Sequence, residues 1–155
     1  MEPQNTIYVL GFAFNHDCSE VLLIEKSQPE FLAGYWNGLG GKVEKGDHSP
    51  AFAMAREFSE EATVYIKPEY WVEFGIMSGP GWRCYLFAYS TETEGETAML
   101  KSKAIQAEEE PIKWALVEAT QSIEKVYPNL RWLIPAAIDN FREPKSIYVQ
   151  HSTRL

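Results

Sequence analysis

Three glycines within six residues, Gly38 to Val43 (GLGGKV), restrict how this chain can fold more than any other feature. Glycine at this density weakens an ordinary strand and indicates backbone that is held close to another part of the molecule. The pattern then changes to helix: Ser49 can cap, Pro50 suits the first turn, and AFAMAREFSEEA contains strong helix formers. We therefore expect a glycine-rich segment and a tight turn that lead directly into a helix.

The predicted helix carries acidic side chains on one face. Glu57, Glu60 and Glu61 are three and four residues apart, so a helix brings them within an arc of about 100°. Like charges this close repel, and Arg56 can offset part of the repulsion through an i,i+4 pair with Glu60. One interpretation is a solvated acidic face. The other is a site for a hard cation such as Mg²⁺, which binds carboxylate oxygens and in turn holds phosphates.

Segments rich in β-branched and aromatic residues predict strands on both sides of this helix. These strands are expected at residues 6–14, 21–26, 71–76, 83–89 and 111–117, with a weaker signal at 147–149. A second helix is expected over 128–141, bent at Pro135, whereas the polar segment 92–106 is expected to be a loop. Strands interleaved with two helices predict an α/β or α+β domain with a mixed sheet.

The composition limits the classes of function. A chain of 155 residues, 45% of them apolar, is long enough for one domain with a sizeable core. We expect no membrane span and no secretory signal, and two cysteines without metal-type spacing favour a reduced, cytoplasmic setting. Fourteen Lys and Arg against 22 Asp and Glu argue against duplex nucleic acid as a partner. Divalent metal ions can still let an acidic protein bind phosphates.

The segment from Gly41 to Val64 resembles the Nudix box, G-x5-E-x7-R-E-U-x-E-E-x-G-U, where U is a large apolar residue. Its matching positions are Gly41, Arg56, Glu57, Phe58, Glu60, Glu61 and Val64. The chain departs from the pattern at three points. Asp47 is the first acid in place of Glu, the spacing from it to Arg56 is one residue longer, and Thr63 replaces a glycine. The insertion leaves the acidic face undisturbed, and whether the shorter Asp47 reaches the metal shell is an open question.

This resemblance implies an α/β/α sandwich around a mixed sheet, and hydrolysis of a nucleoside diphosphate linked to another moiety. It also implies Mg²⁺, with Mn²⁺ as a substitute, bound by the side chains of Glu57, Glu60 and Glu61 and the backbone carbonyl of Gly41. Arg56 is expected to orient these acids without touching the substrate.

A general base for the attacking water is also implied. The candidates are Glu60, Glu61 and the run of three glutamates before Pro111. Within that run Glu109 is favoured by its register with the following strand, and Glu110 is the next choice. Considered alone, such a run is more often a solvated charge cluster.

Residues outside the box resemble the MutT-like branch of the family, which hydrolyses purine nucleoside triphosphates, including oxidised ones. The segment WNGLGGKV and the later YPNL carry this likeness. It implies that Asn37 and Asn129 contact a purine edge and that Phe31 and Tyr127 stack on the base. Without it, the asparagines would be assigned to a turn and a helix start, and the aromatics to the core.

Two lysines are candidate phosphate contacts. Lys42 follows the glycines directly, whereas Lys26 is more simply interpreted as a surface lysine. Leu130 follows Asn129 and cannot hydrogen-bond a base, which makes tolerance of oxidised bases an open question.

The expected function is Mg²⁺-dependent conversion of a purine nucleoside triphosphate, such as 8-oxo-dGTP, to the monophosphate and pyrophosphate. The alternatives are another nucleotide conjugate, such as a dinucleoside polyphosphate or ADP-ribose, or a non-catalytic nucleotide-sensing module. We expect a single domain over residues 1–141 and a C-terminal extension over 142–155. That extension could add an edge strand or contact a second subunit in a homodimer.

Overall fold

The computed structural model describes residues 5–105, 110–122 and 125–151 of the chain. Its strands are β1 Thr6–Phe14, β2 Glu20–Glu25, β3 Trp36–Asn37, β4 Leu39–Lys42, β5 Val72–Gly79, β6 Trp82–Ser90, β7 Ile112–Leu116 and β8 Ile147–Gln150. Its α-helices are α1 Pro50–Ala62, α2 Glu94–Lys103 and α3 Leu130–Arg142, and its 3₁₀-helices are η1 Glu30–Leu32, η2 Pro68–Tyr70 and η3 Glu118–Gln121. Within these ranges no helix is long and apolar enough to cross a bilayer.

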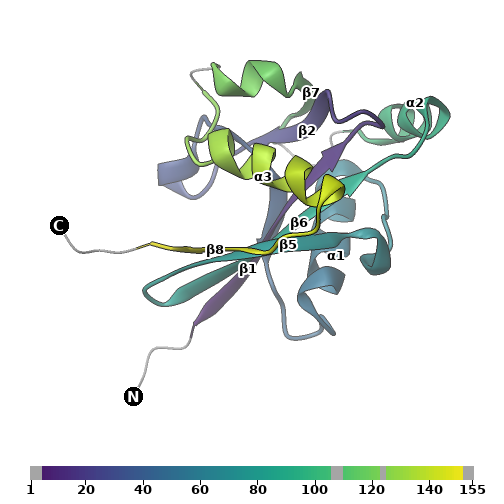
Figure 1. Ribbon diagram of the computed structural model, residues 1–155. Coiled ribbons are helices and arrows are strands. Elements are labelled where there is room, and N and C mark those ends of the chain that lie inside the picture. Colours follow the sequence, from purple (N-terminus) through teal and green to yellow (C-terminus); the bar gives the residue numbers. More distant parts are fainter. Residues whose placement is uncertain (1–4, 106–109, 123–124, 152–155) are drawn as a thin grey trace.

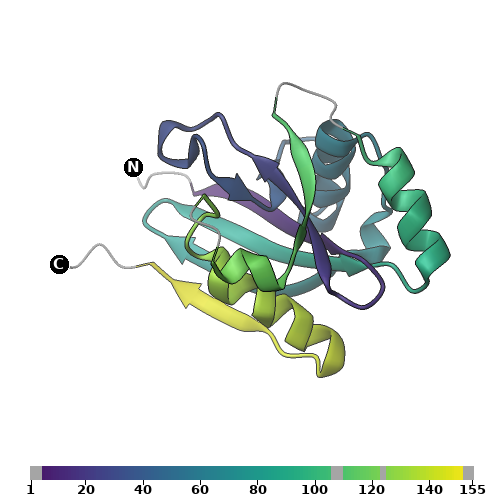
Figure 2. The ribbon, with the colours of Figure 1, turned by 90° about the horizontal axis from the view of Figure 1, so that it is seen from above.

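The strands of the described residues form one mixed sheet with the order β3-β2-β1-β6-β5-β8. β4 also pairs with β1, and β7 also pairs with β2. β1 runs parallel to β6 and β8 runs parallel to β5, whereas the other neighbouring strands are antiparallel. Figure 2 shows β8, in yellow, along one edge of the sheet. The predicted mixed sheet of an α+β domain is therefore confirmed.

Helices cover both faces of this sheet (Figure 1). Under α1, the fully buried side chains of Met54 and Phe58 pack with residues of the central strands. Under α3, Leu133 and Ile134 pack against the opposite face, next to Phe12. Burial of one such side chain contributes about 1.5–3 kcal/mol, so both layers stabilise the fold. The arrangement is the expected α/β/α sandwich.

Helix α1 begins and ends where the sequence predicts. The Ser49 hydroxyl accepts a hydrogen bond from the Phe52 amide at 3.3 Å, and Pro50 is the first helical residue. The helix ends at Ala62, and its C-cap residue Thr63 has a left-handed φ of 62°. This is the position where the box pattern has glycine, which adopts that conformation at little cost. The Thr63 hydroxyl also lies 3.0 Å from the Lys103 carbonyl and so connects α1 to the end of α2.

The expected loop over 92–106 is wrong for most of its length, because α2 occupies Glu94–Lys103. The Thr93 hydroxyl caps this helix by accepting from the Glu96 amide at 3.1 Å. Acids in its first turn and lysines in its last turn complement the helix dipole. Only Thr97 and Leu100 of this helix are buried, so the apolar period that marks a helix in a sequence is nearly absent.

In the C-terminal part, the start of the helix differs from the prediction, whereas the edge strand agrees with it. Helix α3 begins at Leu130 rather than at Pro128, and the Asn129 side chain makes no capping hydrogen bond. The weak strand signal at 147–149 is confirmed as β8, which pairs with β5 from Gly75 to Ser78. The tail therefore contributes an edge strand, one of the two roles considered for it.

Candidate active site

Arg56 is the centre of the hydrogen-bonded cluster on α1. Its Nε donates to one oxygen of Asp47 at 3.0 Å, and its Nη2 donates to the other at 2.9 Å and to the Lys42 carbonyl at 3.0 Å. Its Nη1 donates to Glu57 at 3.0 Å and to Glu60 at 3.2 Å. These bonds use all five donors of a guanidinium. Arg56 thus holds carboxylates from the helix and from the preceding loop in one place.

The Asp47 side chain faces Arg56, which bears on whether this shorter acid reaches the metal shell. Its two oxygens receive the guanidinium as a fork, and Oδ2 also accepts from the Glu44 amide at 2.8 Å. The hydrogen bonds from Arg56 hold the pKa of the Asp47 carboxyl below its usual range, although burial opposes them. The shorter acid therefore serves as the partner of Arg56. The sequence identifies Glu60 as a partner of Arg56 but does not identify Asp47, because that contact depends on the path of the loop.

Glu57 lies against the glycine-rich strand. A Cβ added at Gly41 would be 2.6 Å from the Glu57 carboxylate, so only glycine leaves room for that group. Burial raises the pKa of Glu57, while the hydrogen bond and charge of Arg56 act in the opposite direction. The density of glycines here is thus explained by close approach, as the sequence indicates. At the neighbouring Gly40, a Cβ would collide with the Val9 carbonyl of β1.

Glu61 is the most buried of the three box glutamates, with 6% of its surface exposed. Its Oε1 accepts from the Gly40 amide at 2.9 Å, and its Oε2 lies 3.9 Å from the Lys26 ammonium. Burial raises the pKa of Glu61 to about 8, against the influence of Lys26 and Gly40. Strand β4 therefore positions both glutamates. The Gly40 amide donates to Glu61, and the absence of a side chain at Gly41 leaves room for Glu57.

Lys26 lies beside this cluster, at the end of β2. Its side chain is only 18% exposed, so its assignment as a surface lysine is wrong. Its Nζ donates to Glu110 Oε1 at 3.3 Å, and Glu110 Oε2 accepts from both the amide and the hydroxyl of Ser27. Sequence reasoning missed Ser27, because this contact depends on the pairing of β2 with β7. Glu109, the favoured loop base, lies outside the described residues.

The donors at this site suit a hard divalent cation. Carboxylate oxygens of Glu57, Glu60 and Glu61 and the carbonyl of Gly41 are the ligands that Mg²⁺ prefers. The missing side chain at Gly41 leaves its backbone open to the Glu57 carboxylate. In the described part of the chain, however, no three His, Cys, Asp or Glu side chains are already grouped to hold an ion. Arg56 lies between Glu57 and Glu60, and Glu61 is turned toward Gly40.

The residues expected to contact a base lie near the start of α3. The Tyr127 amide donates to the Trp36 carbonyl at 2.9 Å, which brings Tyr127 next to Asn37 in β3. Asn37 is buried, and its Oδ1 accepts from the Gly38 amide at 2.8 Å. Asn129 Nδ2 lies 4.0 Å from the Met77 sulfur, and its buried Oδ1 has no hydrogen-bond partner among the described residues. Such an acceptor is a candidate for a ligand contact.

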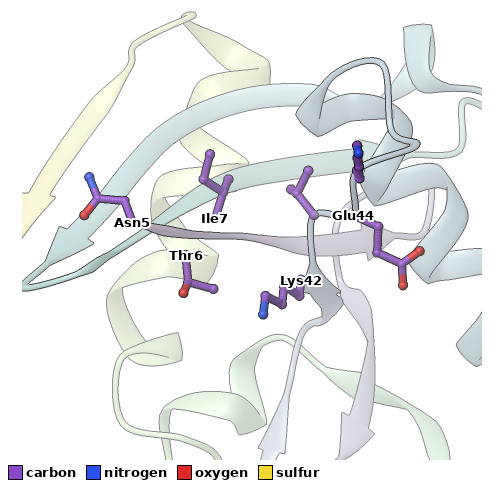
Figure 3. Close-up of a pocket in the computed structure, with 7 residues that line it drawn as sticks. Asn5, Thr6, Ile7, Lys42 and Glu44 are labelled. Carbon is purple, nitrogen blue, oxygen red and sulfur yellow. The ribbon is translucent and has the colours of Figure 1, made fainter. Parts of the chain in front are cut away.

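Two of the expected substrate contacts, Phe31 and Lys42, lie in other elements, η1 and β4. Phe31 in η1 is 67% exposed, so it is not a core residue. Lys42 extends into a hollow of about 280 Å³ beside the start of β1, which is drawn in Figure 3. The other residues that line this hollow are Asn5, Thr6, Ile7, Val43, Glu44 and Lys45. Only the backbone carbonyl of Lys42 is bonded to the Arg56 cluster.

The fold and the acidic cluster define a class of protein. A family model described as the NUDIX domain matches residues 4–136. The chain therefore belongs to the Nudix family and is a pyrophosphohydrolase by that membership. No curated protein sequence matches it significantly.

Several solved structures share the fold. The MutT protein from Bacillus halodurans superposes with a TM-score of 0.68 and 20% identity, over 95% of this chain and 89% of that one. A NUDIX hydrolase from Nitrosomonas europaea gives 0.70 and 14%, over 99% and 82%. The NUDIX domain of Shewanella oneidensis NrtR, solved with ADP ribose, gives 0.70 and 18%, over 91% and 90%. At these identities the likeness concerns the fold alone.

Proposed function

We propose that this protein hydrolyses a purine nucleoside triphosphate to the monophosphate and pyrophosphate with the help of Mg²⁺. The observation that carries this proposal is the position of Glu57 and Glu61 against the glycine strand, with Arg56 tied to Asp47 beside them. The cluster combines hard oxygen donors with a glycine backbone that lets the Glu57 carboxylate approach closely. In an acidic protein, a divalent cation at such a site supplies positive charge that binds a polyphosphate.

Glu57, Glu60, Glu61 and the Gly41 carbonyl would hold the ion, and Mn²⁺ would substitute for Mg²⁺. A bound divalent ion supplies charge stabilisation to phosphoryl oxygens and lowers the pKa of bound water. Arg56 acts as a positioning residue, because its donors are all engaged by the protein.

The proton from the attacking water needs an acceptor. Glu110 is engaged by Ser27 and Lys26, which makes it a poor candidate. Glu60, Glu61 and Glu109 therefore remain as candidates for the general base, and Glu109 is the one favoured by the sequence.

Asn129 and Asn37 support recognition of a base. The Asn129 Oδ1 is a buried acceptor without a described partner, and a donor on a purine edge would satisfy it. Asn37 Oδ1 is engaged by Gly38, so its amide nitrogen is the group left to donate. Tyr127 is in edge contact with Tyr35, with ring centroids 5.7 Å apart, and would form an aromatic wall beside them.

The test is hydrolysis of a nucleotide panel with MgCl₂, with release of pyrophosphate or phosphate as the measurement. The panel contains dGTP, 8-oxo-dGTP, dATP, ADP-ribose and a dinucleoside polyphosphate. We expect turnover of a purine triphosphate that EDTA abolishes. Turnover of ADP-ribose or the dinucleoside polyphosphate alone would replace the proposed substrate. Tight binding without any turnover would instead indicate a sensing module.

Glu57→Gln tests the proposed metal site. We expect activity to fall about 100-fold or more, because even groups that only support metal ligands cost 10- to 100-fold when lost. The matched control is Glu69→Gln, since Glu69 is an exposed glutamate on η2. Full activity in Glu57→Gln would exclude this site.

A cytoplasmic setting and a homodimer remain proposals. Both described cysteines, Cys18 and Cys84, are free, as a reduced compartment would leave them. Sedimentation of the purified protein would measure the oligomeric state.

A further inference from the structure

Three residues at the corner between β2 and β7 form a small charged arrangement beside the acidic helix. Lys26 and Ser27 are consecutive, and together they supply the donors that Glu110 accepts. The Lys26 backbone is fixed as well: its amide donates to Tyr35 at 2.9 Å, and its carbonyl accepts from Gly34 at 2.8 Å. The ammonium group is therefore held in place by the backbone at one end and by Glu110 at the other.

Within the described part of the chain, two carboxylates face the Lys26 ammonium. The Glu110 oxygen is 3.3 Å from Lys26 Nζ, within hydrogen-bond distance, whereas the Glu61 oxygen is 3.9 Å away. All three side chains are largely buried, with exposed fractions of 18% for Lys26, 14% for Glu110 and 7% for Glu61. Charges in such surroundings are only weakly screened, so each of these two acids attracts the ammonium strongly.

Counting only contacts with described residues, one oxygen of Glu61 accepts no hydrogen bond. Its Oε1 accepts from the Gly40 amide, and its Oε2 faces Lys26 beyond hydrogen-bond distance. A direct bond from Lys26 to Oε2 would engage both oxygens. Glu110 is ionised, since the hydrogen bonds from Ser27 and the charge of Lys26 outweigh burial and hold its pKa below the ordinary value.

We infer that Glu110 is a positioning residue that retains Lys26 and so keeps Glu61 Oε2 free to bind a divalent cation. The inference rests on the proposed function, because it assigns Glu61 to the metal shell. Ser27 fixes Glu110 by donating both its amide and its hydroxyl to the same oxygen. Loss of the Glu110 charge would leave Glu61, 3.9 Å away, as the carboxylate paired with Lys26 among residues 5–105 and 110–122.

The test is Mg²⁺ binding without nucleotide, measured by titration calorimetry at pH 8.5, together with thermal melting. We expect Glu110→Gln to weaken Mg²⁺ binding about fivefold or more, because Lys26 turns to Glu61. Adding Lys26→Met to that variant removes the competitor and should restore binding to within about twofold of wild type. The matched control is Glu20→Gln, since Glu20 forms a similar pair with Lys101 at 2.7 Å elsewhere on β2.

Restoration in the double variant is the decisive result, because a merely structural role of Glu110 would not be rescued by a second loss. Unchanged binding in Glu110→Gln, or no restoration, overturns the inference while the proposed function stands. If the wild type itself binds no Mg²⁺, the inference and the proposed function are both wrong.

If the double variant does not melt cooperatively, Ser27→Ala replaces it. That change frees Glu110 in part and should weaken Mg²⁺ binding about twofold, and unchanged binding would again overturn the inference.

Discussion

At the scale of single residues, Arg56 connects most of the charged groups of the site. It bonds carboxylates from α1 and from the preceding loop, and the backbone of β4. The planar fork of a guanidinium fits the two oxygens of Asp47, which a lysine ammonium cannot match. Its removal would therefore disturb several carboxylates at once.

We expect Arg56→Lys to lower the free energy of unfolding by about 1–3 kcal/mol, because charge-assisted hydrogen bonds to Asp47 and the Lys42 carbonyl are lost. Activity should fall by about tenfold or more, since Glu57 and Glu60 lose their common partner. Urea unfolding and the rate of pyrophosphate release measure the two effects. Arg131→Lys on the exposed side of α3 is the control, and equal behaviour of both variants would contradict this role.

Glu61 should make the metal-free protein less stable as the pH rises. Its folded-state pKa of about 8 lies above the ordinary value of 4.5, so the native state keeps this proton longer than the unfolded chain. The contribution to stability is complete below about pH 4.5 and is lost as the pH rises toward 8. Urea unfolding in EDTA at pH 5 to 8 should show wild type losing stability relative to Glu61→Gln. Parallel curves for the two proteins would show that Glu61 is not shifted.

Sequence reasoning reached part of this residue-scale picture. Spacing alone places Glu57, Glu60 and Glu61 on one helix face, because the period of a helix is fixed. It could not assign Asp47 to Arg56 or Glu110 to Ser27. The Asp47 contact depends on the path of a loop. The Glu110 contact depends on the pairing of strands that are more than 80 residues apart in the sequence.

At the scale of elements, β4 supports the site through its backbone. Its two glycines are required for different reasons: Gly40 by the close approach of β1 and by a φ of 155°, and Gly41 by the position of Glu57. A substitution at the first disturbs the sheet, whereas a substitution at the second displaces only the end of a flexible side chain.

We expect Gly40→Ala to destabilise the protein by about 3 kcal/mol or more, because the new methyl group collides with the Val9 carbonyl. Gly41→Ala should change stability by about 1 kcal/mol or less but weaken Mg²⁺ binding and activity about tenfold, since Glu57 must move. Thermal melting and Mg²⁺ titration distinguish the two variants. Similar melting temperatures for both would refute this division of roles.

Elements were predictable where local signals agree. Helix α1 has a cap, a proline at its first position and an apolar face, and its start is predicted correctly. Helix α2 has only two buried residues, so it is stabilised by the packing of a few side chains and by the Thr93 cap. Neither produces a clear apolar period in the sequence. Strand β8 is short and edge-bound, and its partner β5 lies about 70 residues earlier, which leaves only a weak local signal.

At the scale of the whole molecule, the sheet separates the two groups of proposed site residues. The acidic face belongs to α1 on one side of the sheet, whereas Tyr127 packs in the layer under α3 on the other. Asn129 stands at the start of α3 and contacts Met77 of that same layer. Changes in one layer are therefore expected to leave the other largely intact.

Leu133→Ala tests this separation. The side chain is fully buried, so its loss should cost about 2–5 kcal/mol of stability and loosen the start of α3. We expect KM for the triphosphate to rise several-fold while kcat stays within about twofold of wild type. Steady-state kinetics below the melting temperature measure both constants, and a fall in kcat equal to the rise in KM would argue against separate layers.

The separation of the two layers has an evolutionary consequence. On the proposed function, a lineage could change its base preference by altering residues on the α3 side, without rebuilding α1 on the other side of the sheet. Engineers seeking a new substrate would accordingly begin a mutant library around Met77, Tyr127 and Asn129, and leave residues 40–61 untouched.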